Sequence, residues 1–132
     1  MSDDAEDPIF AGSYATPPGL AVRILDLSGA NGADPVEVVT GFQTIAHANA
    51  FARRYVRDSV DRCRGAGMDA AQVLEAWFAF GEDAEVAGAG DAAWRSAAEL
   101  QDFAARRAAD AEERNWRVLD PRRDEGEEDD EG

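Results

Sequence analysis

The chain has 132 residues, of which 28 are acidic and 13 basic, so its formal net charge is -15 at pH 7. This charge disfavours direct binding to nucleic acid or to an anionic membrane. A single cysteine and a single histidine exclude a disulfide framework and metal sites that need several residues of either type. The pattern of a secretion signal and apolar runs long enough to span a membrane are both missing, so we expect a cytoplasmic protein.

The acidic excess is concentrated at the two ends of the chain. Segment 1–18 carries four acids and no base, and segment 120–132 carries eight acids and two arginines. Segments of this kind repel themselves and bury little apolar surface. We therefore expect an acidic flexible arm over 1–18, a single domain over 19–119, and an acidic disordered tail over 120–132.

The first half of the domain predicts two strands and a long helix. Apolar and polar residues alternate over 20–27, and 36–40 is β-branched, so the two segments form an antiparallel hairpin around the Gly- and Asn-containing loop 28–35. Thr44 is a suitable N-cap for an amphipathic helix over 45–64. The apolar arc of this helix comprises Ile45, Ala48, Ala52, Tyr55, Val56, Ser59, Val60 and Cys63.

Capping signatures predict the remaining helices. They are Asp69 with Gln72 before a helix over 70–80, Ser96 with Glu99 before a helix over 97–107, and Asp110 with Glu113 before a last turn that ends near Trp116. Glu82 and Asp83 indicate a turn, with at most a short third strand over 84–87. We predict an α+β fold, in which a small antiparallel sheet of two or three strands packs against the long helix, with two to three shorter helices. The alternative is a mostly helical domain that carries a hairpin.

Few residues point to catalysis, and we assign no catalytic, cofactor-binding or metal-binding residue. His47 lies on the polar side of its helix, where we expect it to be exposed, and Cys63 lies in the apolar arc as an unreactive thiol. Glu82, Asp83 and Glu85 form a carboxylate group that we interpret as a solvated loop. Phosphate-binding, dinucleotide-binding and serine-nucleophile motifs are missing from the sequence.

The arginines of helix 45–64 are the most suggestive feature. Arg53, Arg57 and Arg64 fall within about 40° of each other on a helical wheel, and Arg54 lies on the same polar side of the helix. Three interpretations stay open: a solvated face with pairs such as Arg54 to Asp58, a dock for the protein's own acidic tail, or a contact for an acidic partner or anionic ligand. Trp94 and Trp116 are either interface anchors or residues that close the core.

We therefore predict a small acidic interaction module, an adaptor or regulatory subunit without catalytic activity of its own. Its partner is a protein with an acidic or mixed-charge surface, and the tail from Asp120 competes for the same arginine face. The predicted partner-binding residues are Arg53, Arg54, Arg57, Arg64, Trp94 and Trp116. Two alternatives remain: a nucleic-acid mimic that inhibits a basic nucleic-acid-binding protein, and a small enzyme or enzyme subunit that uses Glu82, Asp83 or His47. The sequence does not specify the oligomeric state.

Overall fold

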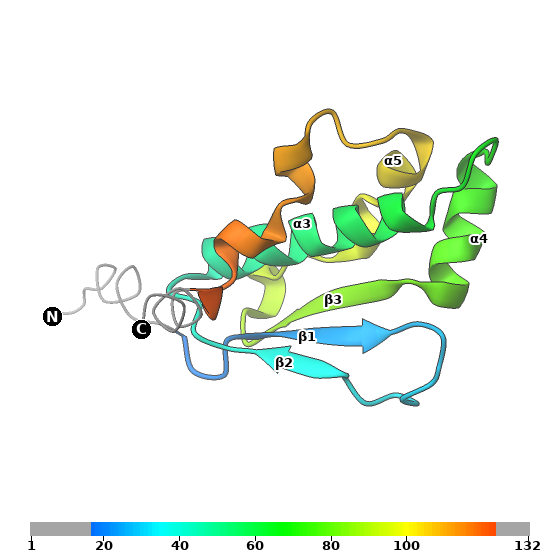
Figure 1. The fold of residues 1–132 in the computed structure, drawn as a ribbon. Coiled ribbons are helices and arrows are strands. Elements are labelled where there is room, and N and C mark those ends of the chain that lie inside the picture. Colours follow the sequence, from blue (N-terminus) through cyan, green and yellow to red (C-terminus); the bar gives the residue numbers. More distant parts are fainter. Residues whose placement is uncertain (1–16, 124–132) are drawn as a thin grey trace, which may run out of the picture.

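Alternating apolar residues build a three-stranded antiparallel sheet in the computed structural model, which describes residues 17–123 (Figure 1). The strands are β1 (Ala21–Asp26), β2 (Glu37–Val39) and β3 (Glu82–Ala87), in the order β2-β1-β3. The sheet and its helices confirm the predicted α+β fold. The predicted arm and acidic tail lie outside the described residues, except for their inner ends.

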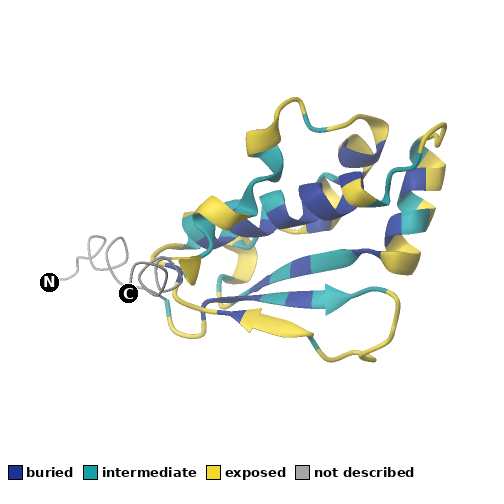
Figure 2. Ribbon diagram, viewed as in Figure 1, coloured by how far each residue is buried: buried dark blue, intermediate teal, exposed yellow. Residues whose placement is uncertain are grey.

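The register of the sheet directs its apolar side chains to one face. Val22 of the central strand lies opposite Val39 on one side and Val86 on the other, and all three are buried. The next inward row pairs Ile24 with Ala84. Because side chains alternate along a strand, these residues share the face that packs against the long helix. Figure 2 shows this buried face between the sheet and the helix.

The long helix α3 (Ile45–Cys63) crosses this face. Thr44 caps its first turn, as predicted, because the Thr44 hydroxyl accepts a hydrogen bond from the His47 N–H at 3.0 Å. The predicted apolar arc forms the centre of the core. Its buried members are Ala48, Ala52, Tyr55, Val56, Ser59 and Val60, with Ile45 and Cys63 packed at the margin.

Helix α4 (Ala70–Phe80) also begins where the sequence predicts, with Asp69 and Gln72 in a complete capping box. It stands at one end of α3 and buries Trp77, whose indole Nε1–H donates to the Ser59 hydroxyl at 3.1 Å. The α4 helix ends at Gly81. A Cβ atom at Gly81 would lie 2.3 Å from Trp77 Cδ1, so the close packing of this indole requires glycine there.

The third strand corrects the sequence-based prediction. Glu82 and Asp83 do not form a turn, since β3 begins at Glu82 and pairs with β1 over its full length. The Glu82 N–H, which points away from β1, is satisfied by the Ser59 hydroxyl at 2.9 Å. Pairing with a central strand and this bond to α3 together outweigh the low strand propensity of the two acids.

The chain then returns along the side of α3 that faces away from the sheet (Figure 1). This return comprises α5 (Leu100–Ala105) and two short 3-10 helices, η3 (Ala111–Arg114) and η4 (Trp116–Leu119). We refer to residues 99–120 as the C-terminal segment. Helix α3 is therefore the middle of three layers, with the sheet on one side and the C-terminal segment on the other.

Two predicted caps in this region have different outcomes. Asp110 caps η3 as expected, because its carboxylate accepts from the Glu113 N–H at 3.2 Å, although the turn is 3-10 rather than α. The capping box of Ser96 and Glu99 does not form. Ser96 begins the short 3-10 helix η2 (Ser96–Ala98), and helix α5 covers only part of the predicted 97–107. The Glu99 carboxylate contacts other side chains, as described below.

Candidate functional site

Two aspartates organise the charged face of α3. The Asp61 carboxylate is buried, and its Oδ1 accepts from Arg64 Nη2 at 2.9 Å. Its Oδ2 accepts from the backbone N–H of Ala108 at 3.0 Å and lies 3.8 Å from Arg57 Nε. An aspartate on α3 therefore fixes the backbone of the C-terminal segment and orients two arginines of its own helix.

Asp58 has the same role nearer the middle of the helix. Its Oδ1 accepts from Arg114 Nε at 2.8 Å, and its Oδ2 accepts from the Trp116 indole N–H at 3.3 Å. Arg62 Nε lies 3.4 Å from Asp58 Oδ2. The Trp116 ring packs on Tyr55, with ring centroids 4.8 Å apart. Asp58 thus binds an arginine and a tryptophan that both come from the C-terminal segment.

The arginines of the same face bind the C-terminal segment through its carbonyl groups. Arg57 is only 2% exposed, stacks 4.7 Å from the centroid of Phe103, and donates from Nη2 to the Arg106 carbonyl at 2.7 Å. Arg64 donates to the carbonyls of Phe103 and Ala104 at 2.6 and 2.9 Å. These carbonyls lie at the C-terminal end of α5, where the carbonyl groups have no backbone N–H donor within their own helix. Burial lowers the pKa of the Arg57 guanidinium.

Arg53 and Arg54 also bind the returning chain. Arg53 donates from Nε and Nη2 to the two oxygens of Glu99, each at 2.7 Å, and the Trp94 indole donates to the same carboxylate at 2.8 Å. The hydrogen bond from Arg53 lowers the pKa of Glu99, and the same bond raises the pKa of Arg53. Arg54 Nη1 donates to the Asn115 carbonyl at 3.2 Å.

All six predicted partner-binding residues thus contact the protein's own chain. The structure brings them together on one side of α3, but the face is covered by residues 99–120 and is not solvated as a whole. The arginines therefore contact the protein's own chain, but the segment that they contact lies before Asp120 and is not the acidic tail named in the second interpretation. Residues 124–132 of the proposed competing tail lie outside the described residues.

His47 is half-buried, so the expectation of an exposed histidine is wrong. Its Nε2 lies 2.7 Å from the Leu119 carbonyl, and its Nδ1 lies 3.4 Å from the Gln43 backbone N–H. These partners assign the proton to Nε2, because a carbonyl only accepts and a backbone N–H only donates. His47 therefore ties the end of η4 to the start of α3.

The carboxylates considered for catalysis do not meet. Glu82 and Asp83 are neighbours in β3, so their side chains point to opposite faces of the sheet. Glu82 accepts from the Tyr55 hydroxyl at 2.7 Å, whereas Asp83 accepts from the Ser96 hydroxyl and the Ala84 N–H. Burial raises the pKa of Asp83, which the two hydrogen bonds partly oppose. His47 lies in the first turn of α3, about 18 Å along the helix from the Ser59 level at which Glu82 begins its strand.

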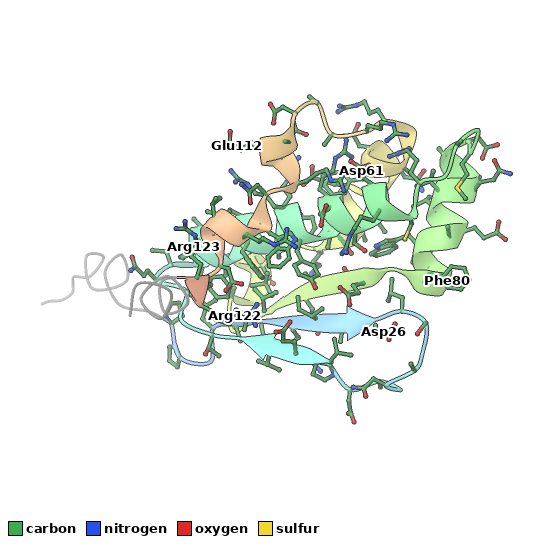
Figure 3. All side chains as sticks on the ribbon, in the orientation of Figure 1. Asp26, Asp61, Phe80, Glu112, Arg122 and Arg123 are labelled. Carbon is green, nitrogen blue, oxygen red and sulfur yellow. The ribbon has the colours of Figure 1, made fainter. Side chains whose placement is uncertain are left out.

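The described residues form a different site at the far end of the molecule. A cleft of about 550 Å³ lies between the C-terminal halves of α3 and α4 and the ends of β1 and β3. Its lining includes Asp26, Ser59, Arg62, Cys63, Phe80 and Glu82. Figure 3 shows Asp26 and Phe80 at this end and Arg122 at the opposite end. We call this site the end cleft.

Two acidic residues are cross-strand partners at the border of the end cleft. Asp26 and Glu82 are direct cross-strand partners in the β1–β3 register. Like charges in this position destabilise a sheet. Hydrogen bonds from Ser28 lower the pKa of Asp26, so it stays ionised at neutral pH. Within residues 17–123, no arginine lies within 4.0 Å of either carboxylate, and Arg62 is directed to Asp58 instead.

An aromatic side chain is exposed beside the same carboxylates. Phe80 borders the end cleft and is 77% exposed. Phe78 is 57% exposed but does not line the cleft, because residues two apart in a helix point to different sides. Burial and the hydrogen bond to Glu82 raise the pKa of Tyr55, so its hydroxyl remains a donor. Burial also raises the pKa of the Cys63 thiol, which therefore has little nucleophilic character at neutral pH.

Sequence reasoning did not find the end cleft. Its two carboxylates come from strands that are distant in the chain, and the prediction placed Glu82 in a turn. Phe78 and Phe80 were assigned only to an apolar helix. The signal that was present is that α4 carries more large apolar residues than one buried face can hold, since only Val73 and Trp77 of this helix are buried.

Comparisons with protein-family models, with curated proteins and with solved structures find no match to this chain. The residues that the structure describes contain no group of three or more His, Cys, Asp or Glu side chains suited to a metal ion. None of the described helices combines the length and the apolar character needed to cross a membrane.

Proposed function

We propose that the protein is a non-catalytic interaction module that binds a partner protein at the end cleft. The observation that carries this proposal is the exposure of Phe80 at the end of α4, beside a cleft with two carboxylates that lack an arginine partner within residues 17–123. Exposed aromatic residues next to a polar cleft are typical of interaction sites.

The charge of the chain and of the cleft favours a basic partner segment. The net charge of -15 attracts a basic protein over long range. Asp26 and Glu82 supply negative charge at the cleft itself, and Arg62 is the positive side chain in its lining. The arginines that the sequence suggests for an acidic partner are bound to residues 99–120, so we assign the partner contact to the end cleft.

The test is partner capture with matched surface variants. The full chain, Phe80→Ser and Val118→Ser are immobilised and exposed to lysate of the source cells. Val118 is the control because it is also exposed, at 45%, but lies in η4. We expect the wild type and Val118→Ser to capture the same protein in stoichiometric amounts, and Phe80→Ser to lose it.

Folding of the variants is checked by thermal unfolding followed by circular dichroism. Both substitutions replace exposed side chains, so we expect melting temperatures close to that of the wild type. Capture that is equal for Phe80→Ser and the wild type would contradict the proposal. Capture that is lost in both variants, or no captured protein at all, would contradict it as well.

A further inference from the structure

We propose that the end cleft binds an arginine side chain of the partner, with the guanidinium held by Asp26 and Glu82 and stacked on Phe80. This inference rests on the proposed function and adds to it the chemistry of the residue that is recognised. It follows from a contrast between two rows of the same strand pair.

In the first row, opposite charges meet. Arg23 of β1 lies opposite Glu85 of β3, and Arg23 Nη1 lies 2.6 Å from Glu85 Oε1. In the second row, Asp26 lies opposite Glu82 at the end of the same two strands. Cross-strand partners have Cβ atoms about 5 Å apart, so two carboxylates in this position repel each other. A cation between them would turn the second row into the equivalent of the first.

The shape of the pair suits a guanidinium. Glu82 accepts from Tyr55 through Oε1, and Asp26 accepts from both the N–H and the hydroxyl of Ser28. A carboxylate can accept about four hydrogen bonds, so each group keeps acceptor capacity for a ligand. A guanidinium is planar and presents several N–H donors, so it can bridge two neighbouring carboxylates. A lysine ammonium supplies the charge without this planar fork.

Phe80 supplies the third contact. Its ring is exposed at the border of the cleft, where a guanidinium plane can stack on it. The protein already uses this geometry internally, since Arg57 stacks on Phe103 at 4.7 Å. Arg62, the positive group in the lining, is drawn toward Asp58 at 3.4 Å, so the two acids and one base leave the cleft with a net negative charge.

The test uses Nα-acetylarginine amide as the probe and Nα-acetylcitrulline amide as its uncharged counterpart. Both are titrated into the 15N-labelled full chain, and backbone amide shifts are followed by NMR. We expect saturable shifts at the end of β1, at Gly81 and at Phe80 with the arginine probe only. Equal shifts with citrulline, or no saturable shift at the cleft, would overturn the proposal.

Three substitutions assign the contacts. Asp26→Asn keeps an acceptor for the Ser28 N–H but removes one charge, and Glu82→Gln keeps an acceptor for Tyr55. We expect each to weaken the affinity for the probe by about tenfold, as for the loss of one charged hydrogen bond. Phe80→Leu removes the stacking ring and should weaken it roughly two- to fivefold. Asp91→Asn, an exposed acid in the 3-10 helix η1 (Gly90–Ala92), is the matched control and should leave the affinity unchanged.

The inference and the proposed function can fail separately. Equal weakening by Asp26→Asn and Asp91→Asn would mean that the probe senses only the total charge, which overturns the inference. A partner whose capture needs Phe80 but tolerates Asp26→Asn and Glu82→Gln would also overturn it while the proposed function stands. Arginine binding without any captured partner would instead contradict the proposed function.

Discussion

The charged face of α3 and the end cleft use the same residue types in opposite ways. On α3, Asp58 and Asp61 each contact arginines, and both also bind donors from the C-terminal segment. At the cleft, Asp26 and Glu82 meet each other instead of an arginine. A run of charges on a helix therefore does not identify a binding surface. What matters is whether the rest of the chain returns to cover it.

The two regions also differ in burial and in how their charges are stabilised. The α3 face is largely buried, and its two aspartates are stabilised by hydrogen bonds and ion pairs, which buried charges require. Arg57 makes one hydrogen bond through Nη2, and its Nε and Nη1 have no hydrogen-bond partner among the described residues. The end cleft is open to solvent, and two acidic residues are cross-strand partners at its border. We therefore expect changes on the α3 face to affect stability, and changes at the cleft to affect binding.

The largest effect is expected from Arg64→Ala. This change removes the donors that satisfy Asp61 and the last carbonyls of α5, and it leaves a buried carboxylate with fewer partners. We expect a loss of about 3–5 kcal/mol in the free energy of unfolding, as for breaking a buried ion pair, measured by urea denaturation.

Arg106→Ala is the control for that variant. Arg106 pairs with Asp102 one turn away, but its side chain is 62% exposed, so the change should cost no more than about 0.5 kcal/mol. A comparable loss of stability in both variants would show that the buried network has no special role.

An intermediate effect is expected from Ser59→Ala, because Ser59 lies between the α3 face and the end cleft. The Ser59 hydroxyl accepts from the Trp77 indole and from the Glu82 N–H, and alanine leaves both donors without an acceptor. We expect a loss of about 1–3 kcal/mol. Ser28→Ala, at an exposed position, should change the unfolding free energy much less, and the reverse order would contradict this assignment.

Two carboxylates of the described chain should respond to pH with opposite sign. The pKa of Glu99 is lowered by Arg53, so its contribution to stability is present above its unfolded pKa and is lost as the pH falls through the folded pKa. The pKa of Asp83 is raised by burial, so stability is greatest when it is protonated and decreases as the pH rises through its folded pKa.

Conservative amides separate these two contributions. Glu99→Gln should destabilise the protein at pH 7 by about 1–2 kcal/mol, and the loss should shrink toward acid pH. Asp83→Asn should leave stability at pH 7 unchanged or slightly higher. The measurement is urea unfolding between pH 3 and pH 8, and the same sign for both variants at pH 7 would contradict the assignment.

The smallest effect on stability is expected at the end cleft. Asp26→Asn removes one of two neighbouring like charges, but it also weakens the Ser28 hydrogen bonds that lower the pKa of Asp26 and favour its ionised form. These two effects oppose each other at an exposed position, so the melting temperature should stay close to that of the wild type. Differential scanning calorimetry at low salt is the measurement, because salt screens the charge interactions. A clear decrease in the melting temperature would show that Asp26 mainly stabilises the fold.

Local signals made much of the fold predictable. Thr44 and the pair Asp69 and Gln72 begin their helices as expected, because capping is decided by residues within one turn. The apolar arc of α3 is also read correctly from its periodicity. The Ser96 and Glu99 signature fails because Asp83 and Arg53, which are distant in sequence, bind those two side chains more favourably.

The candidate site was less predictable for the same physical reason. The helical wheel places Arg57 and Arg64 on the polar side of α3, but only the path of residues 99–120 shows that this side is covered. Likewise, the cross-strand pairing of Asp26 with Glu82 depends on the β1–β3 register. Contacts between segments that are distant in sequence determine which residues come together at both sites. A single sequence contains no local pattern that predicts such contacts.

The most direct test of this contrast is an NMR titration of the 15N-labelled full chain with two peptides, hexa-arginine and hexa-glutamate. Backbone amides and arginine Nε–H groups are followed together. The account predicts that hexa-arginine shifts the resonances around Asp26, Phe80 and Gly81, and that neither peptide shifts the Nε–H groups of Arg53, Arg57 and Arg64. Saturable shifts of those arginine resonances with hexa-glutamate, without shifts at the end cleft, would contradict this account. They would show that the binding surface lies on α3.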